Sequence, residues 1–180
     1  MFDINTYEAR SSIKSFYRNY HTKHNLIGVE IGVDTGNNAE TILNLFQIKM
    51  LYLIDPYIKY DGYPDLCQEN AFEIASEKLK DHRDRIQFIK KKSEDAIDDI
   101  PNGLDFIYID GNHTYEYVKK DINLYWPKLK LGGYMMGNDF SEAFPDVVKA
   151  VTEFQVNNCK HILIAHHNDW LIIRNPYEKR

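Results

Sequence analysis

The segment LDFIYIDGNHTY, residues 104–115, places a carboxylate and a histidine directly after a run of mostly apolar residues. Asp110 ends the run, and His113 follows three residues later. A second apolar run, GGYMMGND, ends in Asn138 and Asp139. Carboxylate and amide oxygens suit a hard divalent cation such as Mg²⁺, and a histidine with a near-neutral pKa suits proton removal from a hydroxyl group. These residue types indicate a site that binds a metal and removes a proton.

Each of these residues also has an alternative role that the sequence leaves open. Asp110, Asn138 and Asp139 can instead hydrogen-bond a substrate, and with only two carboxylates a metal binds weakly or is absent. His113 can instead be a residue at a helix N-terminus that packs its ring under the loop, with Thr114 as the helix cap.

A second cluster lies in VEIGVDTGNNAETIL, where Glu30 ends an apolar run and Gly32 and Gly36 precede a helical pattern. Glycines there let the backbone turn sharply and let a ligand approach it, and the helix N-terminus offers free N–H groups. The next apolar run ends at Asp55, 19 residues beyond Gly36. An acid at that position can accept hydrogen bonds from both ribose hydroxyls of an adenosine.

The spacing of this cluster also discriminates among nucleotide ligands. A dinucleotide-binding loop has the pattern Gly-x-Gly-x-x-Gly, and here Asp34 occupies the position of the middle glycine. Its carboxylate would face a pyrophosphate where the backbone must come closest. The loop therefore favours a ligand without phosphates, and a nicotinamide-dependent oxidoreductase remains the weaker alternative.

The elements that must position these residues alternate between apolar runs and amphipathic stretches. About five strand–helix repeats predict a doubly wound parallel sheet, in which ligands bind beyond the carboxyl ends of the strands. The last two runs, in HILIAHHNDWLIIRN, are separated by too few residues for a crossover helix, so the final strand must be antiparallel to its neighbour. The expected strands are 26–32, 49–55, 85–90, 104–110, 132–139, 161–167 and 170–175.

We therefore predict an α/β, Rossmann-like, seven-stranded, mostly parallel sheet with a C-terminal antiparallel hairpin strand. The chain is expected to form one domain, with residues 1–25 as a helical extension and 26–180 as the core. A helix is expected from Thr6 to Tyr20. Three further helical faces are predicted by apolar spacing: Ala39, Ile42, Leu43 and Phe46; Val118, Ile122, Tyr125 and Leu129; and Val147, Val151 and Phe154.

Composition limits the class of partner. The net charge of −5 argues against a nucleic-acid-binding surface, and no apolar run approaches the length of a membrane span. The two cysteines form no metal-binding or disulfide pattern, which is typical of reduced thiols in the cytoplasm. We expect a cytoplasmic protein that acts on a small molecule, without nucleic-acid or membrane partners.

The acidic residue and glycines after the first strand, the acid after the second and the terminal antiparallel strand together resemble class I S-adenosylmethionine (SAM)-dependent methyltransferases. The resemblance extends over nearly the whole chain from Leu26 onward. It implies SAM as the cofactor. The residues that it places around the cofactor are Glu30, Gly32 and Gly36 at the methionine part, Asp55 at the ribose, and Ser93 and Glu94 at the adenine, and Asp110 is expected to be a further cofactor-binding residue.

The motif DGNHTY is similar to the Asp-Gly-x-His-[Ser/Thr]-Tyr motif of a subgroup of small-molecule O-methyltransferases. This resemblance implies a sugar hydroxyl as the leading acceptor, His113 as general base with Asp110 in the catalytic site, and Mg²⁺ held by Asp110, Asn138 and Asp139. In catechol-type relatives the pair after the fifth strand is Asp then Asn, whereas this sequence has the reverse order.

The source of the acceptor pocket stays open between the N-terminal helix, the loop from Tyr57 to Tyr63 and a second subunit of a homo-oligomer. A methyltransferase-like module that binds a ligand without catalysis is an alternative from another class. The presence together of Asp110, His113 and Asp139 argues against it.

Overall fold

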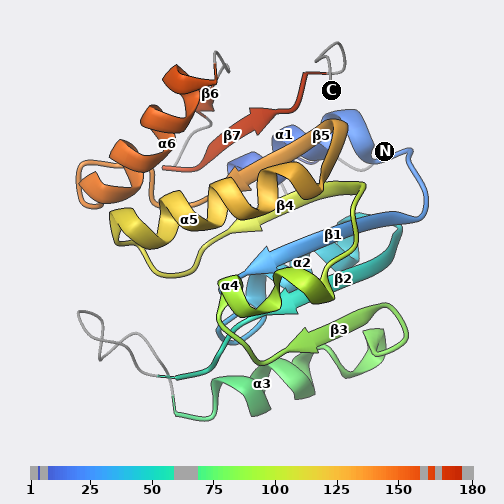
Figure 1. Cartoon of the computed structure of the whole chain (residues 1–180). Helices are drawn as coiled ribbons and strands as arrows, with labels where there is room; N and C mark the ends of the chain where they lie inside the picture. The colour runs from blue at the N-terminus through green and yellow to red at the C-terminus, as the bar shows by residue number, and fades with distance from the viewer. Residues whose placement is uncertain (1–3, 5–7, 59–68, 159–161, 165–167, 176–180) are drawn as a thin grey trace.

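A computed structural model of the chain describes residues 4, 8–58, 69–158, 162–164 and 168–175. Within these ranges seven strands form one sheet in the order β3-β2-β1-β4-β5-β7-β6 (Figure 1). The strands are β1 (Leu26–Ile31), β2 (Ile48–Ile54), β3 (Ile86–Ile89), β4 (Leu104–Ile109), β5 (Leu129–Gly137), β6 (Ile162–Ile164) and β7 (Trp170–Ile173). The helices are α1 (Ser11–Tyr20), α2 (Asn37–Leu45), α3 (Ala71–Lys78), α4 (Ser93–Ala96), α5 (Tyr115–Tyr125) and α6 (Pro145–Asn157).

The strand directions confirm the predicted fold class. Strands β1 to β5 pair in parallel with one another, whereas β7 runs antiparallel to both β5 and β6. The carboxyl ends of β1, β2, β4 and β5 therefore meet at one edge of the sheet. None of the helices in the described ranges combines the length and the apolarity that crossing a bilayer requires.

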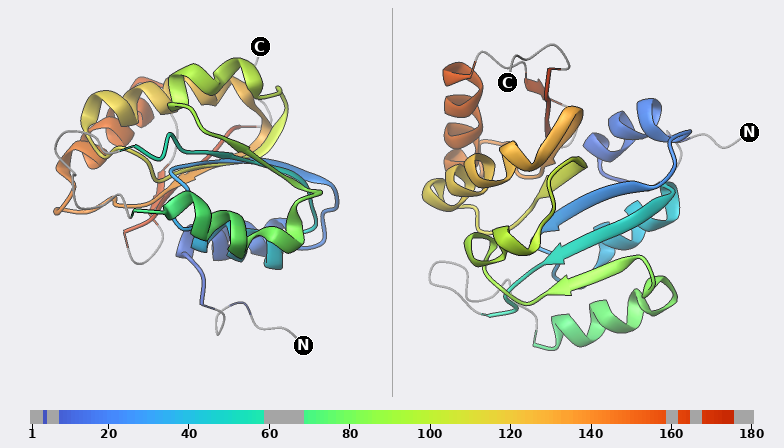
Figure 2. Two further views of the ribbon diagram at one scale, coloured as in Figure 1. Left: turned by 90° about the horizontal axis from the view of Figure 1, so that it is seen from below. Right: turned by 45° about the vertical axis from the view of Figure 1, so that its right-hand side comes forward.

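Helices cover both faces of the sheet. The left view of Figure 2 shows α5 and α6 on one side and α1, α2 and α3 on the other. All six residues of β4 are buried, because this central strand has helices on both of its faces. Phe16 of α1 lies between Phe46, Phe106 and Tyr134, with ring centroids 5.0–5.2 Å apart. The N-terminal helix is thus part of the hydrophobic core.

Two boundaries differ from the sequence-based prediction by more than two residues. Leu129 was expected on the face of a helix, but α5 ends at Tyr125 and Leu129 begins β5, paired with Leu104. Pro127, in a 3-10 turn, explains the difference, because proline lacks the N–H that a continuing helix would use. The N-terminal helix begins at Ser11 instead of Thr6, which lies outside the described residues.

Two other expected segments are only partly described. Strand β6 confirms the central part of the segment 161–167, and the remaining four residues of that segment lie outside the described ranges. The same holds for residues 59–63 of the tyrosine-rich loop.

Asp169, next to β7, anchors the start of α1. Its Oδ2 accepts hydrogen bonds from the backbone N–H of Ser12 at 2.8 Å and from the Ser12 hydroxyl at 2.7 Å. Asp169 is buried, and burial raises the pKa of its carboxyl, while the bonds from Ser12 oppose that rise. Asp169, which directly precedes β7, thereby holds the start of α1 at the edge of the sheet where β4 and β5 end.

Asp169→Ala is expected to destabilise the fold by about 1–3 kcal/mol, because it leaves buried donors of Ser12 without an acceptor. Urea unfolding of the wild type and the variant measures this difference. Ser15→Ala on the same helix is the matched control. Equal stability of the two variants would contradict the anchoring role.

Candidate active site

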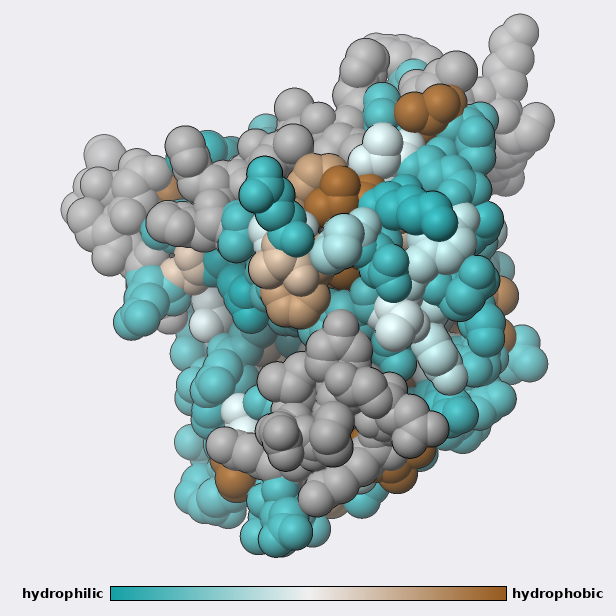
Figure 3. Space-filling view, turned by 90° about the vertical axis from the view of Figure 1, so that its left-hand side faces the viewer, coloured by the Kyte–Doolittle hydropathy of each residue, from teal (hydrophilic) through white to brown (hydrophobic). Residues whose placement is uncertain are grey.

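One cavity of about 740 Å³ lies at the carboxyl ends of β1, β2, β4 and β5. Figure 3 looks onto this edge of the sheet, and hydrophilic residues dominate the described surface there. A cavity of this size is typical of small-molecule and cofactor sites. The predicted site residues that line it are Glu30, Gly32, Asp55, Ser93, Glu94, Asp110, His113, Asn138 and Asp139.

The structure does not place Gly36 on the cavity wall. Its φ of +80° is in the left-handed region, and it forms the N-terminal boundary of α2. A Cβ atom there would contact Ala75 and Leu79 at 3.4 Å. Gly36 therefore serves the turn into α2 and the packing against the end of α3.

Gly32 joins the two predicted clusters. Its φ is +84°, and a Cβ atom at this position would lie 2.1 Å from the carbonyl oxygen of Asp110. Only glycine allows this approach. The end of β1 consequently lies directly against the end of β4.

Asp55 uses much of its carboxylate to hold the loop after β1. Its Oδ2 accepts the backbone N–H groups of Val33 at 2.9 Å and Asp34 at 3.0 Å, and its Oδ1 accepts that of Tyr57 at 2.8 Å. A carboxylate offers about four acceptor positions, so about one remains for a ligand. Asp55 thus orders the loop, and its predicted contact with both ribose hydroxyls remains a prediction.

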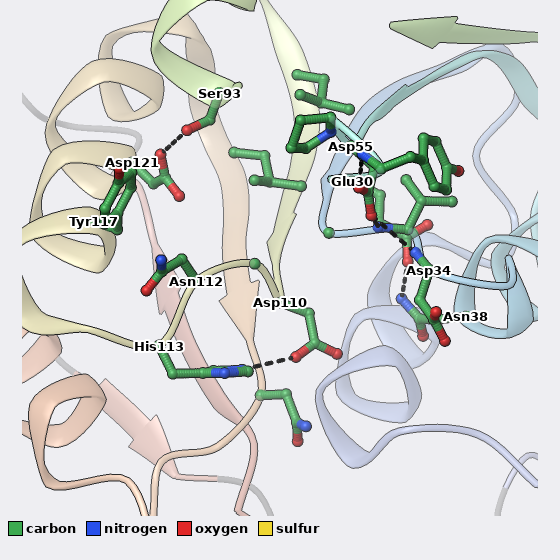
Figure 4. A pocket seen from close by; sticks show the side chains of 18 of the residues that line it. Glu30, Asp34, Asn38, Asp55, Ser93, Asp110, Asn112, His113, Tyr117 and Asp121 are labelled. Atoms are coloured by element: carbon green, nitrogen blue, oxygen red, sulfur yellow. Dashed lines mark hydrogen bonds and ion pairs between the residues drawn. The ribbon is translucent and has the colours of Figure 1, made fainter. Parts of the chain in front are cut away.

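Glu30 is a buried carboxyl with a vacant acceptor. It is 1% exposed, and its Oε1 accepts a hydrogen bond from Asn38 at 3.1 Å (Figure 4). Its Oε2 has no hydrogen-bond partner in the described part of the chain. Burial raises the pKa of Glu30 to about 8. A cationic group entering the cavity would supply the missing partner and favour the ionised form.

Ser93 and Glu94, at the start of α4, line the cavity beside a residue that the sequence reasoning missed. The Ser93 hydroxyl donates to Asp121 of α5, which is 2% exposed and also lines the cavity (Figure 4). Glu94 Oε1 lies 3.3 Å from Lys120 Nζ. Asp121 was not predicted because the sequence around it has the pattern of an ordinary amphipathic helix.

Asp110, His113 and Asp139 form a compact cluster on the cavity wall. His113 Nε2 lies 2.8 Å from Asp139 Oδ2 and 3.5 Å from Asp110 Oδ1. Candidate ligand atoms of the three residues lie within 4.8 Å of one another, and Asn138 lines the same cavity. Burial alone would lower the pKa of His113, but the hydrogen bonds and charges of the two carboxylates outweigh it and raise this pKa to about 9. His113 therefore holds a proton near neutral pH in the free protein.

Arg10 is a second residue that the sequence reasoning missed. Its Nη2 lies 3.2 Å from Asp110 Oδ2, and it lines the cavity. Burial would lower the pKa of Arg10, but the nearby acidic groups raise it. The contact joins residues that are 100 positions apart, so no local pattern in the sequence predicts it.

Comparison with known proteins decides the family. A family model described as a methyltransferase domain matches residues 29–140, which is more than half of the chain. The chain belongs to this methyltransferase family. An uncharacterised protein of Acanthamoeba polyphaga mimivirus is 31% identical over 164 residues, which cover 83% of this chain and 70% of that protein.

Solved structures of other proteins share the fold of the chain. SMU.1697c from Streptococcus mutans, solved in complex with SAH, has a TM-score of 0.67 and 14% identity, covering 92% of this chain and 98% of its own. An rRNA methylase from Streptococcus thermophilus has a TM-score of 0.64 and 14% identity, over 91% and 95%. The O-methyltransferase NovP has a TM-score of 0.63 and 17% identity, over 92% and 76%. Membership of a methyltransferase family sets the oxidoreductase alternative aside.

The residues of this methyltransferase fit the cofactor. SAM carries an α-ammonium group and a sulfonium, both of which are cations. The vacant Oε2 of Glu30 suits the ammonium, because a buried acceptor without a partner is costly. The cavity wall carries seven acidic side chains, which suit a ligand with two cationic groups and a net positive charge.

Glu30→Gln is expected to stabilise the free methyltransferase at alkaline pH. The folded-state pKa of about 8 lies above the ordinary value of 4.5, so the wild-type contribution is complete at low pH and is lost as pH rises toward 8. The free energy of unfolding of the wild type should fall relative to the variant by roughly 2–4 kcal/mol between pH 5 and 8. Urea unfolding at both pH values measures this, with Glu40→Gln on α2 as control.

The same variant should lose affinity for the amino-acid half of the cofactor. S-adenosylhomocysteine (SAH) carries that half, whereas 5′-methylthioadenosine (MTA) lacks it. Calorimetry should show SAH binding weakened by about 10- to 100-fold in Glu30→Gln, the worth of one hydrogen bond to a charged group, and MTA binding unchanged. Equal losses for both ligands would contradict a contact between Glu30 and the ammonium.

Proposed function

We propose that this methyltransferase transfers the methyl group of SAM to a hydroxyl oxygen of a small molecule, with a sugar hydroxyl as the leading acceptor. The observation that carries the proposal is the cluster of Asp110, His113 and Asp139 on the wall of the cofactor cavity. An acid, a base and room for a divalent cation are the groups that activation of a hydroxyl requires. The O-methyltransferase NovP shares the fold, and the motif DGNHTY points the same way.

The chain offers a separate group for each part of the cofactor. When bound, SAM supplies an electrophilic methyl group on its sulfonium. Glu30 would hold the ammonium and Asp55 one ribose hydroxyl, while Ser93 and Glu94 would lie at the adenine. Gly32 would let the backbone after β1 come close to the methionine part, beside Asp110.

Asp110 and Asp139, with Asn138, would hold a divalent cation such as Mg²⁺. When bound, the cation would lower the pKa of the acceptor hydroxyl. In the free protein Arg10 and His113 supply the positive charge beside these carboxylates. A metal would therefore compete with Arg10 and His113 for these carboxylates, which predicts a modest affinity for the metal.

His113 is the proposed general base. Its proton is held in the free protein because Asp139 Oδ2 lies 2.8 Å from Nε2. Asp110 and Asp139 must therefore bind another cation or the substrate, so that His113 releases its proton, before His113 can accept a proton from the acceptor. This requirement links the base to the occupation of the acidic pair.

Charge and the cavity wall guide the choice of acceptor. The net charge of −5 disfavours RNA as substrate, although an rRNA methylase shares the fold. Arg10 lies on the cavity wall just before α1, which favours the N-terminal segment as one source of the acceptor pocket. Tyr57, at the start of the tyrosine-rich loop, also lines the cavity, so this loop is the next proposed source, and a second subunit of a homo-oligomer stays the third.

Methyl transfer from radiolabelled SAM to a panel of sugars tests the proposal, with Mg²⁺ or with a chelator. His113→Ala should lower kcat by about 10²- to 10⁴-fold, as expected for loss of a general base. Asp139→Asn should remove any stimulation by Mg²⁺. The exposed His24→Ala is the control.

Unchanged turnover in His113→Ala would remove this residue from the mechanism and leave a binding module or another base. Methylation of rRNA, with none of the sugars, would contradict the proposed acceptor class.

A further inference from the structure

Two acidic side chains on α4 and α5 face the cavity with unlike surroundings. Asp121 is buried, and its only side-chain partner in the described part of the chain is the Ser93 hydroxyl, which bonds Oδ1. Figure 4 shows its second oxygen turned toward the interior of the cavity. Glu94 pairs through Oε1 with Lys120 at 3.3 Å, whereas its Oε2 is buried and has no hydrogen-bond partner among the described residues.

The charges around Asp121 leave its carboxyl uncompensated. Glu94 on α4 faces it with a like charge, and Lys120 on α5 is engaged by Glu94. Tyr125, also on α5, donates its hydroxyl to the carbonyl of Ser93 at 2.8 Å. Burial raises the pKa of Asp121 to about 7, and only the bond from Ser93 and the charge of Lys120 oppose this.

Glu94 is shifted in the opposite direction. Burial would raise the pKa of its carboxyl, but a hydrogen bond from its own backbone and the contact with Lys120 lower it. Near neutral pH the cavity therefore presents one ionised carboxylate, which only accepts, and one carboxyl group that can carry a proton and donate. Two neighbouring carboxyl groups with divergent pKa values take different roles.

The Watson–Crick edge of adenine has the complementary pattern. Its N6 amino group donates and its N1 accepts, side by side. We propose that Glu94 accepts from N6 and that Asp121, in its protonated form and braced by Ser93, donates to N1, so that this pair selects adenine and makes its binding dependent on pH. The inference rests on the proposed cofactor site and assigns a role to Asp121 within it.

The proposal predicts how affinity for the nucleoside part of the cofactor changes with pH. MTA is the probe, because it lacks the ammonium that Glu30 would bind. A group with a pKa near 7 is about 90% protonated at pH 6 and about 10% at pH 8. The dissociation constant of MTA should therefore rise roughly tenfold from pH 6 to pH 8 in the wild type.

Asp121→Asn should keep the affinity that the wild type has at pH 6 and lose the pH dependence, because an amide donates a hydrogen bond at either pH. Asp121→Leu, which offers no donor, should bind MTA about tenfold more weakly than Asp121→Asn. Glu116→Gln, on the exposed face of α5, should behave as the wild type. Thermal unfolding without ligand reports whether each variant is folded.

A second measurement needs no variant. In 5′-methylthioinosine, N1 carries a hydrogen atom and therefore donates, so the ionised form of Asp121 is the better partner. Affinity for this analogue should rise from pH 6 to pH 8 in the wild type, opposite to the trend for MTA.

Three outcomes would overturn the inference alone: MTA binding that is independent of pH in the wild type, equal affinities of Asp121→Asn and Asp121→Leu, or parallel pH trends for the two analogues. Absence of binding for both SAH and MTA at every pH would instead contradict the proposed cofactor site, and the inference with it.

Discussion

The mutual repulsion of seven acidic side chains around one cavity is the constraint on which the rest of the site depends. They are Glu30, Asp34, Asp55, Glu94, Asp110, Asp121 and Asp139. Parallel strands that end at a common edge bring most of them together, and removal from water makes the ionised forms of the buried Glu30 and Asp121 costly. The free protein must offset this cost, and the way it does so differs from one acid to the next.

Three ways of offsetting the cost are visible. Asp55 accepts hydrogen bonds from backbone N–H groups of the loop after β1 and so orders that loop. Asp110 and Asp139 lie against Arg10 and His113. Glu30 and Asp121 have no cationic side chain of this kind, and burial raises the pKa of each. The acids without a cation are therefore those best able to respond to a ligand that brings a cation or an acceptor.

The close contact between Gly32 and the carbonyl of Asp110 connects these groups in space. It brings the end of β1, where the cofactor loop begins, against the end of β4, where the acid and histidine cluster begins. A methyl donor held by the first and an acceptor held by the second would consequently meet without a large movement of the chain. The fold supplies proximity, which is the main requirement of methyl transfer.

Residues that end strands were predictable from sequence, because the apolar runs and the acids that follow them are local patterns. Glu30, Asp55, Asp110 and Asp139 all line the predicted edge for this reason. Arg10 and Asp121 were missed, since their roles depend on contacts between distant segments. The rise in the pKa of His113 likewise depends on carboxylates that the fold brings together.

The prediction that the helix of Val118 and Ile122 continues to Leu129 is wrong for another reason. Apolar spacing continues unbroken from α5 into β5, and only Pro127 marks the change. Periodicity therefore identified the helix but not its end.

A crystal structure of the methyltransferase with SAH would show directly whether the acidic cavity holds the cofactor. We expect the α-amino nitrogen within hydrogen-bond distance of Glu30 Oε2, the adenine against Ser93 and Asp121, and the sulfur atom turned toward Asp110. SAH bound outside this cavity, or bound within it with its amino group remote from Glu30, would contradict the proposed cofactor site.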